Sequence, residues 1–401
     1  MPAVAAALVF ACSESAARAQ DRADPAETAT FRRGPIALSP SVTISSGTDS
    51  NVLNTSVNPR SDVTFSLQPG VTMWMRFRAL HVSLQNQTTL NRYVELSEQS
   101  GVNTMNGGRL ELWLNRVTPY AGLRYLNTKE RATLEVDDRA RYRDVAVTAG
   151  VGINVSAKTI VDVSADRYSV AYDAGAAPSS DALREAFDRS GERYRVSVGY
   201  ALTPLTTVSF VTETERASFD FSPERDSTTV KFGPAVDFKP FALLSGRAQV
   251  GMLVFRPDDP NVPRFSGSSA QVDLSYVLHG ATRFTVSVQR GLNYSAGGSA
   301  TYYLQTGFGL AVNHQFTEHW DAQARLGRAR LDYQEPPSTG PVTRAPLGDD
   351  VISGYGGGMG YRFSKGTRLG LNVEYSERES TREGASYDGL RMFGSVTISF
   401  E

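Results

Sequence analysis

The chain has 401 residues, of which 40% are hydrophobic and 21% charged, and its formal net charge is −1. No apolar run approaches the roughly 20 residues that a transmembrane helix needs, which excludes a helical membrane protein. The near-neutral charge gives no reason to expect nucleic-acid binding. A single cysteine, Cys12, excludes a disulfide framework.

The first 34 residues differ in composition from the rest of the chain. A short apolar stretch precedes Ala17-Arg18-Ala19, which is a small-x-small cleavage site. We therefore expect a signal peptide over residues 1–19, although the positive charges that usually open such a segment are missing. The residues before Cys12 fit a lipoprotein signal poorly, so a cysteine removed with the signal peptide is the favoured interpretation over a lipidated one. The polar residues 20–34 predict a flexible periplasmic lead-in.

From residue 35 onward, apolar and polar residues alternate. Across residues 63–77 the apolar positions are Val63, Phe65, Leu67, Val71, Met73, Met75 and Phe77. A strand places successive side chains on opposite faces, whereas an amphipathic helix repeats apolar residues three and four apart. The pattern therefore predicts two-faced strands.

Short reversals and longer polar loops separate these strands in alternation. The short reversals are expected at Arg78-Ala79, Thr118-Pro119, Lys158-Thr159, Thr203-Pro204, Lys239-Pro240, His279-Gly280, Thr317-Glu318 and Lys365-Gly366. The longer loops are expected at 47–61, 96–107, 132–141, 173–190, 221–227, 257–267, 294–300, 334–350 and 379–387. Eight turns and nine loops join about eighteen strands, an even number such as bacterial barrels use. Tight turns in the periplasm then place both termini on the periplasmic side.

The last strand has the same two-faced pattern. Met392, Val396 and Phe400 share one face, and Phe400 with the preceding Gly394 resembles the terminal signal read by the barrel-assembly machinery, although Glu401 follows the aromatic. One face would meet lipid and the other a polar lumen. The sequence predicts an all-β fold, a transmembrane antiparallel up-and-down β-barrel of about 18 strands over residues 35–401. A soluble sandwich or propeller is the rival, but no blade repeat is visible and the strands are long.

One central hairpin carries a family resemblance. Its residues are Arg225-Asp226-Ser227, Val230, Gly233, Asp237-Phe238-Lys239-Pro240, Leu244-Ser245-Gly246 and Gly251. This stretch resembles the outer-membrane "putative β-barrel porin 2" family, in which strand, turn and glycine-bearing return strand recur. The resemblance covers about residues 36–400 and is close only in the central hairpins. It implies an outer-membrane port, and it implies an association with exopolysaccharide synthesis and export.

The polar face of the strands supplies the candidate lumen residues. They are Trp74, Trp113, Arg124, Asp162, Arg195, Lys231, Asp237, Arg247, Asp273, Arg283, Arg325 and Glu374. Both signs occur in similar numbers, which suits a neutral, hydroxyl-rich solute better than an ion-selective ring. Exposed aromatic faces could stack on sugar rings. The structural interpretation, which is favoured for any single residue, is that these charges pair between neighbouring strands and hold the barrel together.

The functional expectation is a channel for hydrophilic solutes, with exopolysaccharide export as its more specific form. The alternative is a closed structural or adhesive barrel whose loops bind a partner, and loops 173–190 and 334–350 are long enough to display a surface or to plug the lumen. No cofactor, metal site or enzymatic activity is expected, because the histidines lack ligand spacing and no Ser–His–acid set can be assembled. Expected partners are outer-membrane lipid, lipopolysaccharide, the barrel-assembly machinery, and polysaccharide or periplasmic export components.

Three local features carry further expectations. Pro234 lies inside a predicted strand and predicts a bulge or local break, because it cannot donate to the ladder. Gly356-Gly357-Gly358 and Gly360 predict a close approach to the strand backbone or a kink rather than a phosphate loop. The loop over Ser180 to Arg189 predicts one or two turns of helix.

Overall fold

The computed structural model describes residues 29–175, 180–239, 243–297, 300–334 and 348–400. The predicted signal peptide over residues 1–19 lies outside these residues, as does most of the lead-in. The elements are β1 (Phe31–Arg33), β2 (Ile36–Asp49), β3 (Asp62–Phe77), β4 (Leu80–Tyr93), η2 (Ser97–Gln99), β5 (Gly101–Leu112), β6 (Val117–Thr128), β7 (Tyr142–Asn154), β8 (Thr159–Tyr172), α1 (Ser180–Phe187), β9 (Arg189–Thr203), β10 (Thr206–Phe219), η3 (Pro223–Arg225), β11 (Ser227–Phe238), β12 (Leu244–Pro257), β13 (Phe265–Leu278), β14 (Thr282–Tyr294), β15 (Tyr302–Gln315), β16 (Trp320–Gln334), β17 (Asp349–Arg362), β18 (Thr367–Ser380) and β19 (Tyr387–Ser399).

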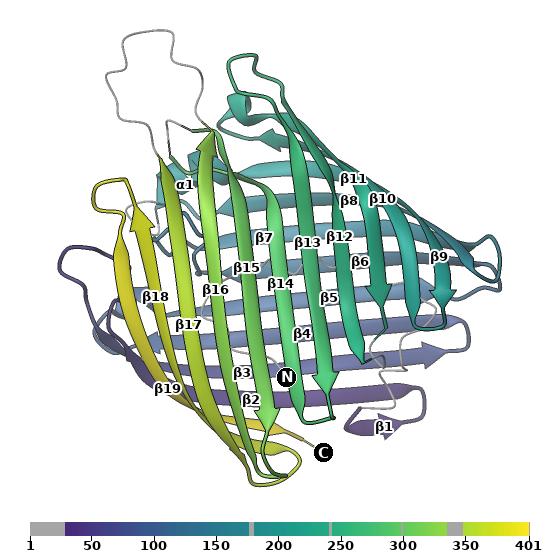
Figure 1. Ribbon diagram of the computed structural model, residues 1–401, viewed down its shortest axis with the longest axis horizontal. Helices are drawn as coiled ribbons and strands as arrows, with labels where there is room; N and C mark the ends of the chain where they lie inside the picture. The colour runs from purple at the N-terminus through teal and green to yellow at the C-terminus, as the bar shows by residue number, and fades with distance from the viewer. Residues whose placement is uncertain (1–28, 176–179, 240–242, 298–299, 335–347, 401) are drawn as a thin grey trace.

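Strands β2 to β19 form one closed sheet (Figure 1). Each pairs antiparallel with the next strand along the chain, and β19 pairs with β2, for example at Ser395 and Ser45, which closes the barrel. The predicted up-and-down barrel of about 18 strands is confirmed. The additional strand β1 pairs with Ile36–Leu38 at the start of β2.

The alternation along each strand separates an apolar outer face from a polar inner face. Leu123, Phe210 and Leu371 are 52%, 54% and 67% exposed on the outside of the sheet. Glu213 and Glu374 lie on the other face and are nearly buried. Strands that cross a bilayer need an outward apolar belt of this kind. No helix in the described part of the chain is long and apolar enough to cross a membrane.

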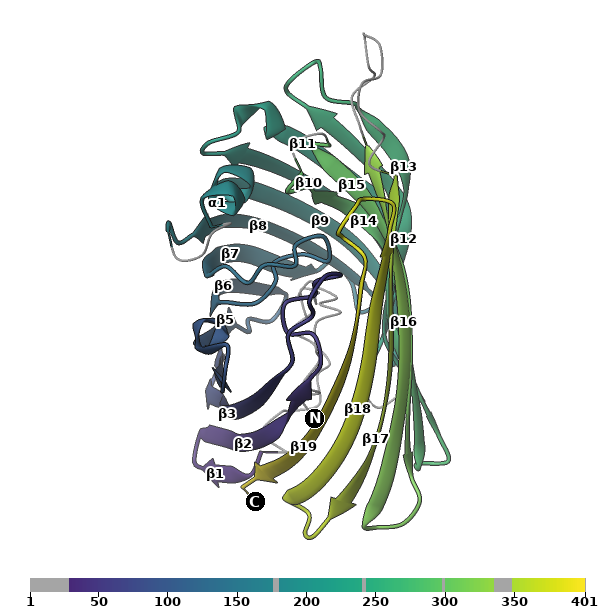
Figure 2. The same ribbon diagram turned by 90° about the vertical axis from the view of Figure 1, so that its left-hand side faces the viewer.

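The connections at the two ends of the barrel differ in length. Most short reversals fall where the sequence predicts them, and α1 confirms the short helix expected in the loop after β8, where Figure 2 shows it beside that strand. We call the end with the loops of 129–141, 173–188 and 295–301 the long-loop end. The predicted turn at Lys239-Pro240 lies partly outside the described residues.

Two predicted connections are wrong. Thr118 and Pro119 lie inside β6, and the chain reverses at 113–116, because the pairing of β5 with β6 continues to Glu111 and Tyr120. The expected loop at 96–107 is mostly strand, because β5 begins at Gly101 and its polar residues extend the ladder with β4. In both places, pairing with the neighbouring strand overrides the local turn and loop preferences.

The expected irregularity at Pro234 is present as a local break. The ladder between β11 and β12 is interrupted between Phe232 and Ala235, whereas the ladder between β10 and β11 is continuous there. The register is the same on both sides of the interruption, so Pro234 removes pairing without shifting the strand.

Candidate functional site

The twelve predicted lumen residues lie on the inner side of the barrel wall. Each of the eleven within strands alternates with outward-facing side chains, as Arg195 does between the exposed Tyr194 and Val196. Trp113 follows the end of β5 and packs on the inner-face ring of His81. The full set is Trp74, Trp113, Arg124, Asp162, Arg195, Lys231, Asp237, Arg247, Asp273, Arg283, Arg325 and Glu374.

Many of these charges are paired along the wall. Arg247 donates to Asp237 at 3.2 Å. Arg195 contacts Glu213 at 2.5 Å, and Lys231 lies 3.7 Å from the same side chain. These pairs join neighbouring strands, which agrees with the structural interpretation of the charges and removes much of their field from the lumen.

Three predicted residues lack such partners. Among the described residues, no ion pair or hydrogen bond reaches the side chains of Trp74, Asp273 or Arg283, whereas Arg124 contacts Asp144 at 3.1 Å. The charges of Asp273 and Arg283 are therefore compensated less in the lumen than the charges of the paired residues are.

Trp113 is less available to a solute than the sequence suggests. The ring of His81 stacks on it with centroids 3.9 Å apart, and its Nε1 donates to Glu111 at 2.8 Å. The guanidinium of Arg76 lies 5.9 Å from the ring centroid. Trp74 is the predicted aromatic with no ring partner among the described residues, so it is the better candidate for stacking.

The glycine-rich stretch of β17 allows pairs to cross an intervening strand. Arg325 on β16 contacts Glu374 on β18, and Gly356 of β17 lies between them in register. A Cβ built at Gly356 would lie 2.8 Å from Nε of Arg325. The predicted close approach to a glycine backbone is confirmed, and the approaching group is a side chain.

The same arrangement recurs on the other side of the barrel. Tyr120 on β6 donates its hydroxyl to Asp162 on β8 at 3.1 Å. Gly150 of β7 lies beneath the ring, where an added Cβ would be 2.4 Å from Cζ of Tyr120. Gly356 and Gly150 therefore leave room on the inner face for side chains that reach across one strand to contact the next.

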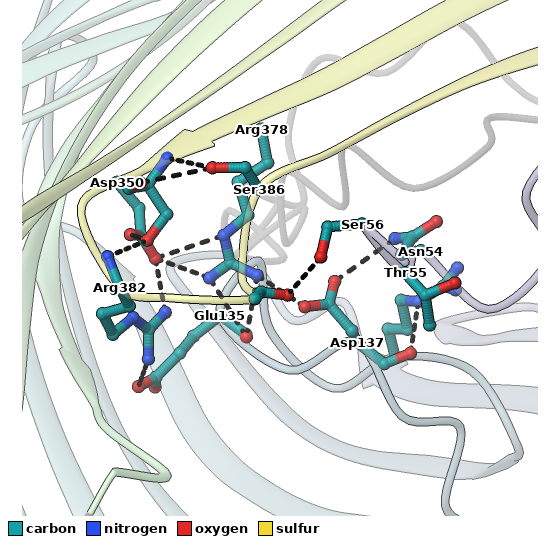
Figure 3. Close-up of polar contacts among 12 residues, drawn as sticks. Asn54, Thr55, Ser56, Glu135, Asp137, Asp350, Arg378, Arg382 and Ser386 are labelled. Atoms are coloured by element: carbon teal, nitrogen blue, oxygen red, sulfur yellow. Dashed lines mark hydrogen bonds and ion pairs between the residues drawn. The ribbon is translucent and has the colours of Figure 1, made fainter. Parts of the chain in front are cut away.

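The long-loop end of the lumen holds a buried polar network, shown in part in Figure 3. We call it the cross-lumen network; its members are Glu135 and Asp137 of loop 129–141, Arg225 of η3, Ser295 after β14, Asp350 of β17, Arg378 of β18 and Arg382 after β18. Loop 129–141 joins β6 to β7. Ser295 lies in the loop between β14 and β15, and β15 is half-way round the barrel from β6. Contacts between these segments therefore span the lumen.

Arg378 lies at the centre of one half of the network. Its side chain is 0% exposed and donates to Asp350 at 2.6 Å and to Asp137 at 2.7 Å. It also donates to the backbone carbonyl of Glu135 at 3.2 Å. Arg382 contacts the same oxygen of Asp350 at 2.5 Å. Loop 129–141 is thereby attached to β17 and β18.

Ser295 connects the other half. Its hydroxyl donates to Glu135 at 2.7 Å, and the N–H of Ala296 donates to the second carboxylate oxygen at 2.8 Å. Arg225 donates to the carbonyls of Ser295 at 2.5 Å and of Ala186 at 3.2 Å. Because Ala186 belongs to α1, the contacts run without interruption from α1 to β18.

Apolar contacts support loop 129–141 on both sides. Val136 and Ala140 pack in a cluster with Tyr168 of β8 and with Leu183 and Phe187 of α1. Leu134 packs against a second cluster, whose buried members are Ala300, Tyr303, Leu331, Tyr333 and Ile352. The loop therefore fills space between opposite walls.

Burial changes the acidity of the loop carboxyls. Burial raises the pKa of Glu135, although the hydrogen bonds from Ser295 and Ala296 oppose the shift. Burial also raises the pKa of Asp137, against the charge of Arg378. A carboxyl that loses water is harder to ionise.

Sequence reasoning missed the cross-lumen network. It singled out loops 173–190 and 334–350 as the segments able to plug the lumen, and residues 335–347 lie outside the described residues. The available signal is composition, because Leu134, Val136 and Ala140 are apolar residues in a segment that the sequence predicts to be a polar loop. Within the described residues no group of three or more His, Cys, Asp or Glu side chains could hold a metal ion.

Comparison with known proteins gives one family match. The model of the family described as putative beta-barrel porin 2 matches residues 24–400. No curated protein matches the sequence.

Solved structures give distant likenesses. OccK2 (OpdF) of Pseudomonas aeruginosa in complex with glucuronate is 10% identical, with 91% of this chain and 98% of that chain covered and a TM-score of 0.49. A BenF-like porin from Pseudomonas fluorescens Pf-5 is 10% identical, with 90% and 98% covered and a TM-score of 0.48. OccK11 (OpdR) of Pseudomonas aeruginosa is 12% identical, with 90% and 96% covered and a TM-score of 0.45.

Proposed function

Because this chain belongs to the putative beta-barrel porin 2 family, we propose that it is a channel for hydrophilic solutes whose outer mouth is narrowed by the cross-lumen network. The protein is an integral outer-membrane β-barrel, and its family and fold favour a channel over an enzyme. In the proposed orientation the short turns and both termini face the periplasm, and the long-loop end faces outward.

One contact carries the proposal. The hydrogen bond from Ser295 to Glu135 joins loops from opposite sides of the barrel. A loop that crosses the lumen at one level restricts passage there and leaves the wall below it free to contact solutes. Barrels of this strand number enclose an aqueous channel unless loops fold inward.

The proposed mechanism is diffusion along a polar wall, limited by the network. Paired charges such as Arg247 and Asp237 offer hydrogen bonds with little net field, which suits hydroxylated solutes. Asp273, Arg283 and Trp74 are the wall residues that we assign to direct solute contact. Passage beyond the size of the constriction requires loop 129–141 to move away from Arg378.

The second candidate is a closed structural or adhesive barrel. The observation in its favour is the complete burial of Asp350, Arg378 and Ser295, because fully enclosed ionic groups indicate a tightly closed outer end. Exopolysaccharide export, the role implied by the family resemblance, would require a wider opening than diffusion of small solutes does.

Swelling of proteoliposomes tests the proposal. The purified full chain, shown to be folded by heat-modifiable migration, is placed in an isosmotic monosaccharide, disaccharide or trisaccharide. The expected result is swelling that slows as the sugar becomes larger. No swelling with any sugar would contradict the channel and support the closed barrel. Inhibition of monosaccharide entry by exopolysaccharide fragments would support the export role.

A further inference from the structure

A row of arginines lies on the outer surface of the barrel near the long-loop end. Arg167 on β8, Arg216 on β10 and Arg256 on β12 occupy alternate strands, and Glu192 and Thr228 lie between them in register. Neighbouring strands are about 4.8 Å apart, so successive arginines are roughly 10 Å apart along the row. We call these three residues the arginine row.

The three side chains point away from the lumen. Arg216 is in phase with the exposed Phe210 on the same strand, and Arg256 is in phase with the exposed Met252. All three arginines are themselves exposed. Each lies beyond the large outward apolar residues of its strand, toward the long-loop end, and so at the edge of the lipid-facing belt.

The arginine row is not neutralised by the protein. Within the described residues, no ion pair or hydrogen bond reaches the side chains of Arg167, Arg216 or Arg256. Glu192, although it stands between two of them in the row, accepts a hydrogen bond from Tyr194 at 3.0 Å instead. This contrasts with the inner wall, where most of the arginines predicted from the sequence contact a carboxylate.

The basic character continues beyond the row along the same side of the barrel, and outside this sector Arg92 on β4 also lies in phase with an outward apolar residue, Leu90. On β14 and β16, Arg290 and Arg328 also lie in phase with outward apolar residues. On β18 and β19 the corresponding outward positions near the long-loop end are acidic, namely Glu377, Glu379 and Asp388. The outer surface therefore has a basic sector from β8 to β16.

We propose that the arginine row binds the phosphate groups of lipid A in the outer leaflet. Guanidinium groups form paired hydrogen bonds with phosphate, and each basic side chain near an anionic membrane surface adds about 1 kcal/mol of attraction. A row at the edge of the apolar belt meets the headgroups while the strand below it meets the acyl chains. The inference rests on the proposed orientation, with the long-loop end outward, and is independent of whether the lumen conducts.

Binding of lipid A to the full-length barrel in detergent tests this inference. The titrants are phosphorylated lipid A and its dephosphorylated form, with inorganic phosphate as competitor, and binding is followed by native mass spectrometry. The variant carries Arg167→Gln, Arg216→Gln and Arg256→Gln. The control carries Arg78→Gln, Arg116→Gln and Lys365→Gln, which remove three exposed cations from the short turns at the opposite end of the barrel.

The expected result is preference for phosphorylated lipid A by the wild-type chain and by the control. The row variant should bind it more weakly by about fivefold for each arginine, or roughly a hundredfold in all. Equal binding by the row variant and the control would overturn the proposal, as would equal binding of the two lipid A forms. Full displacement by inorganic phosphate at equal concentration would indicate a free-anion site instead. The row variant should keep wild-type liposome swelling, so loss of lipid binding is separable from loss of the channel.

Discussion

Arg325 on β16 and Glu374 on β18 form an ion pair across the backbone of Gly356 on the strand between them. The absence of a side chain at Gly356 is what lets the guanidinium lie against the sheet and reach the second strand. Inner-face charges are thereby joined over three strands, which stiffens the wall and compensates charge in the lumen.

Gly356→Ala should destabilise the barrel, because its Cβ would meet Nε of Arg325 at 2.8 Å. Overpacking of this kind costs about 1–3 kcal/mol in unfolding free energy. The matched control is Gly357→Ala on the opposite face, where the nearest atom to the added Cβ, the carbonyl oxygen of Gln323, is 3.7 Å away. Denaturant unfolding in lipid vesicles measures both, and equal losses would contradict the role given to Gly356.

Arg378→Gln should release loop 129–141. Loss of the Arg378 guanidinium leaves Asp137 without its ion-pair partner and leaves Asp350 paired with Arg382 alone. Breaking a buried pair in this way costs about 3 kcal/mol. Hydrogen exchange of the loop amides should accelerate, whereas Arg330→Gln, which removes an exposed pair with Asp349, should cost about 0–1 kcal/mol and leave the loop unchanged. Unchanged protection of the loop in Arg378→Gln would argue against its anchoring role.

Conductance should rise with pH above the usual range of carboxyl titration. The pKa values of Glu135 and Asp137 are raised by burial above their ordinary values of 4.5 and 3.8. A group with a raised pKa in the docked loop stabilises docking fully below its ordinary pKa and loses that contribution as pH rises through the raised value. Single-channel recordings from pH 4 upward measure the effect, and Glu135→Gln should flatten it. A wild-type conductance that falls as pH rises would contradict this sign.

Ion selectivity should depend on the unpaired wall charges. Arg283→Gln should shift the reversal potential in a salt gradient toward cations, because this side chain has no compensating partner among the described residues. The double variant Asp237→Asn with Arg247→Gln should leave the potential nearly unchanged, because it removes one charge of each sign from a pair. A larger shift in the double variant than in Arg283→Gln would show that the paired residues dominate the field.

The barrel could be predicted from the sequence because apolar and polar residues alternate along its strands. The period of two predicts the strands around Leu123 and Phe210 and places Asp237 and Arg247 on the inner face. The close approach of a side chain at Gly356 follows from the absence of a Cβ there. The turn misplaced at Thr118-Pro119 shows where local preference yields to strand pairing.

The cross-lumen network could not be predicted in the same way. Glu135 and Ser295 are 160 residues apart, and nothing in either loop specifies the other. Their contact depends on the diameter of the closed barrel and on which loops turn inward. Leu134 and Val136 are the local sign that loop 129–141 packs against protein, and they do not identify its partners.

Single-channel conductance of a loop-shortened variant tests whether loop 129–141 constricts the polar lumen. Residues 132–138 are replaced by a short Gly-Ser linker, and the variant is compared with the wild-type chain in planar bilayers at one salt concentration. We predict larger conductance steps in the shortened variant and faster entry of trisaccharides into liposomes. Steps of equal size in the two folded proteins would contradict the claim and place the restriction elsewhere in the barrel.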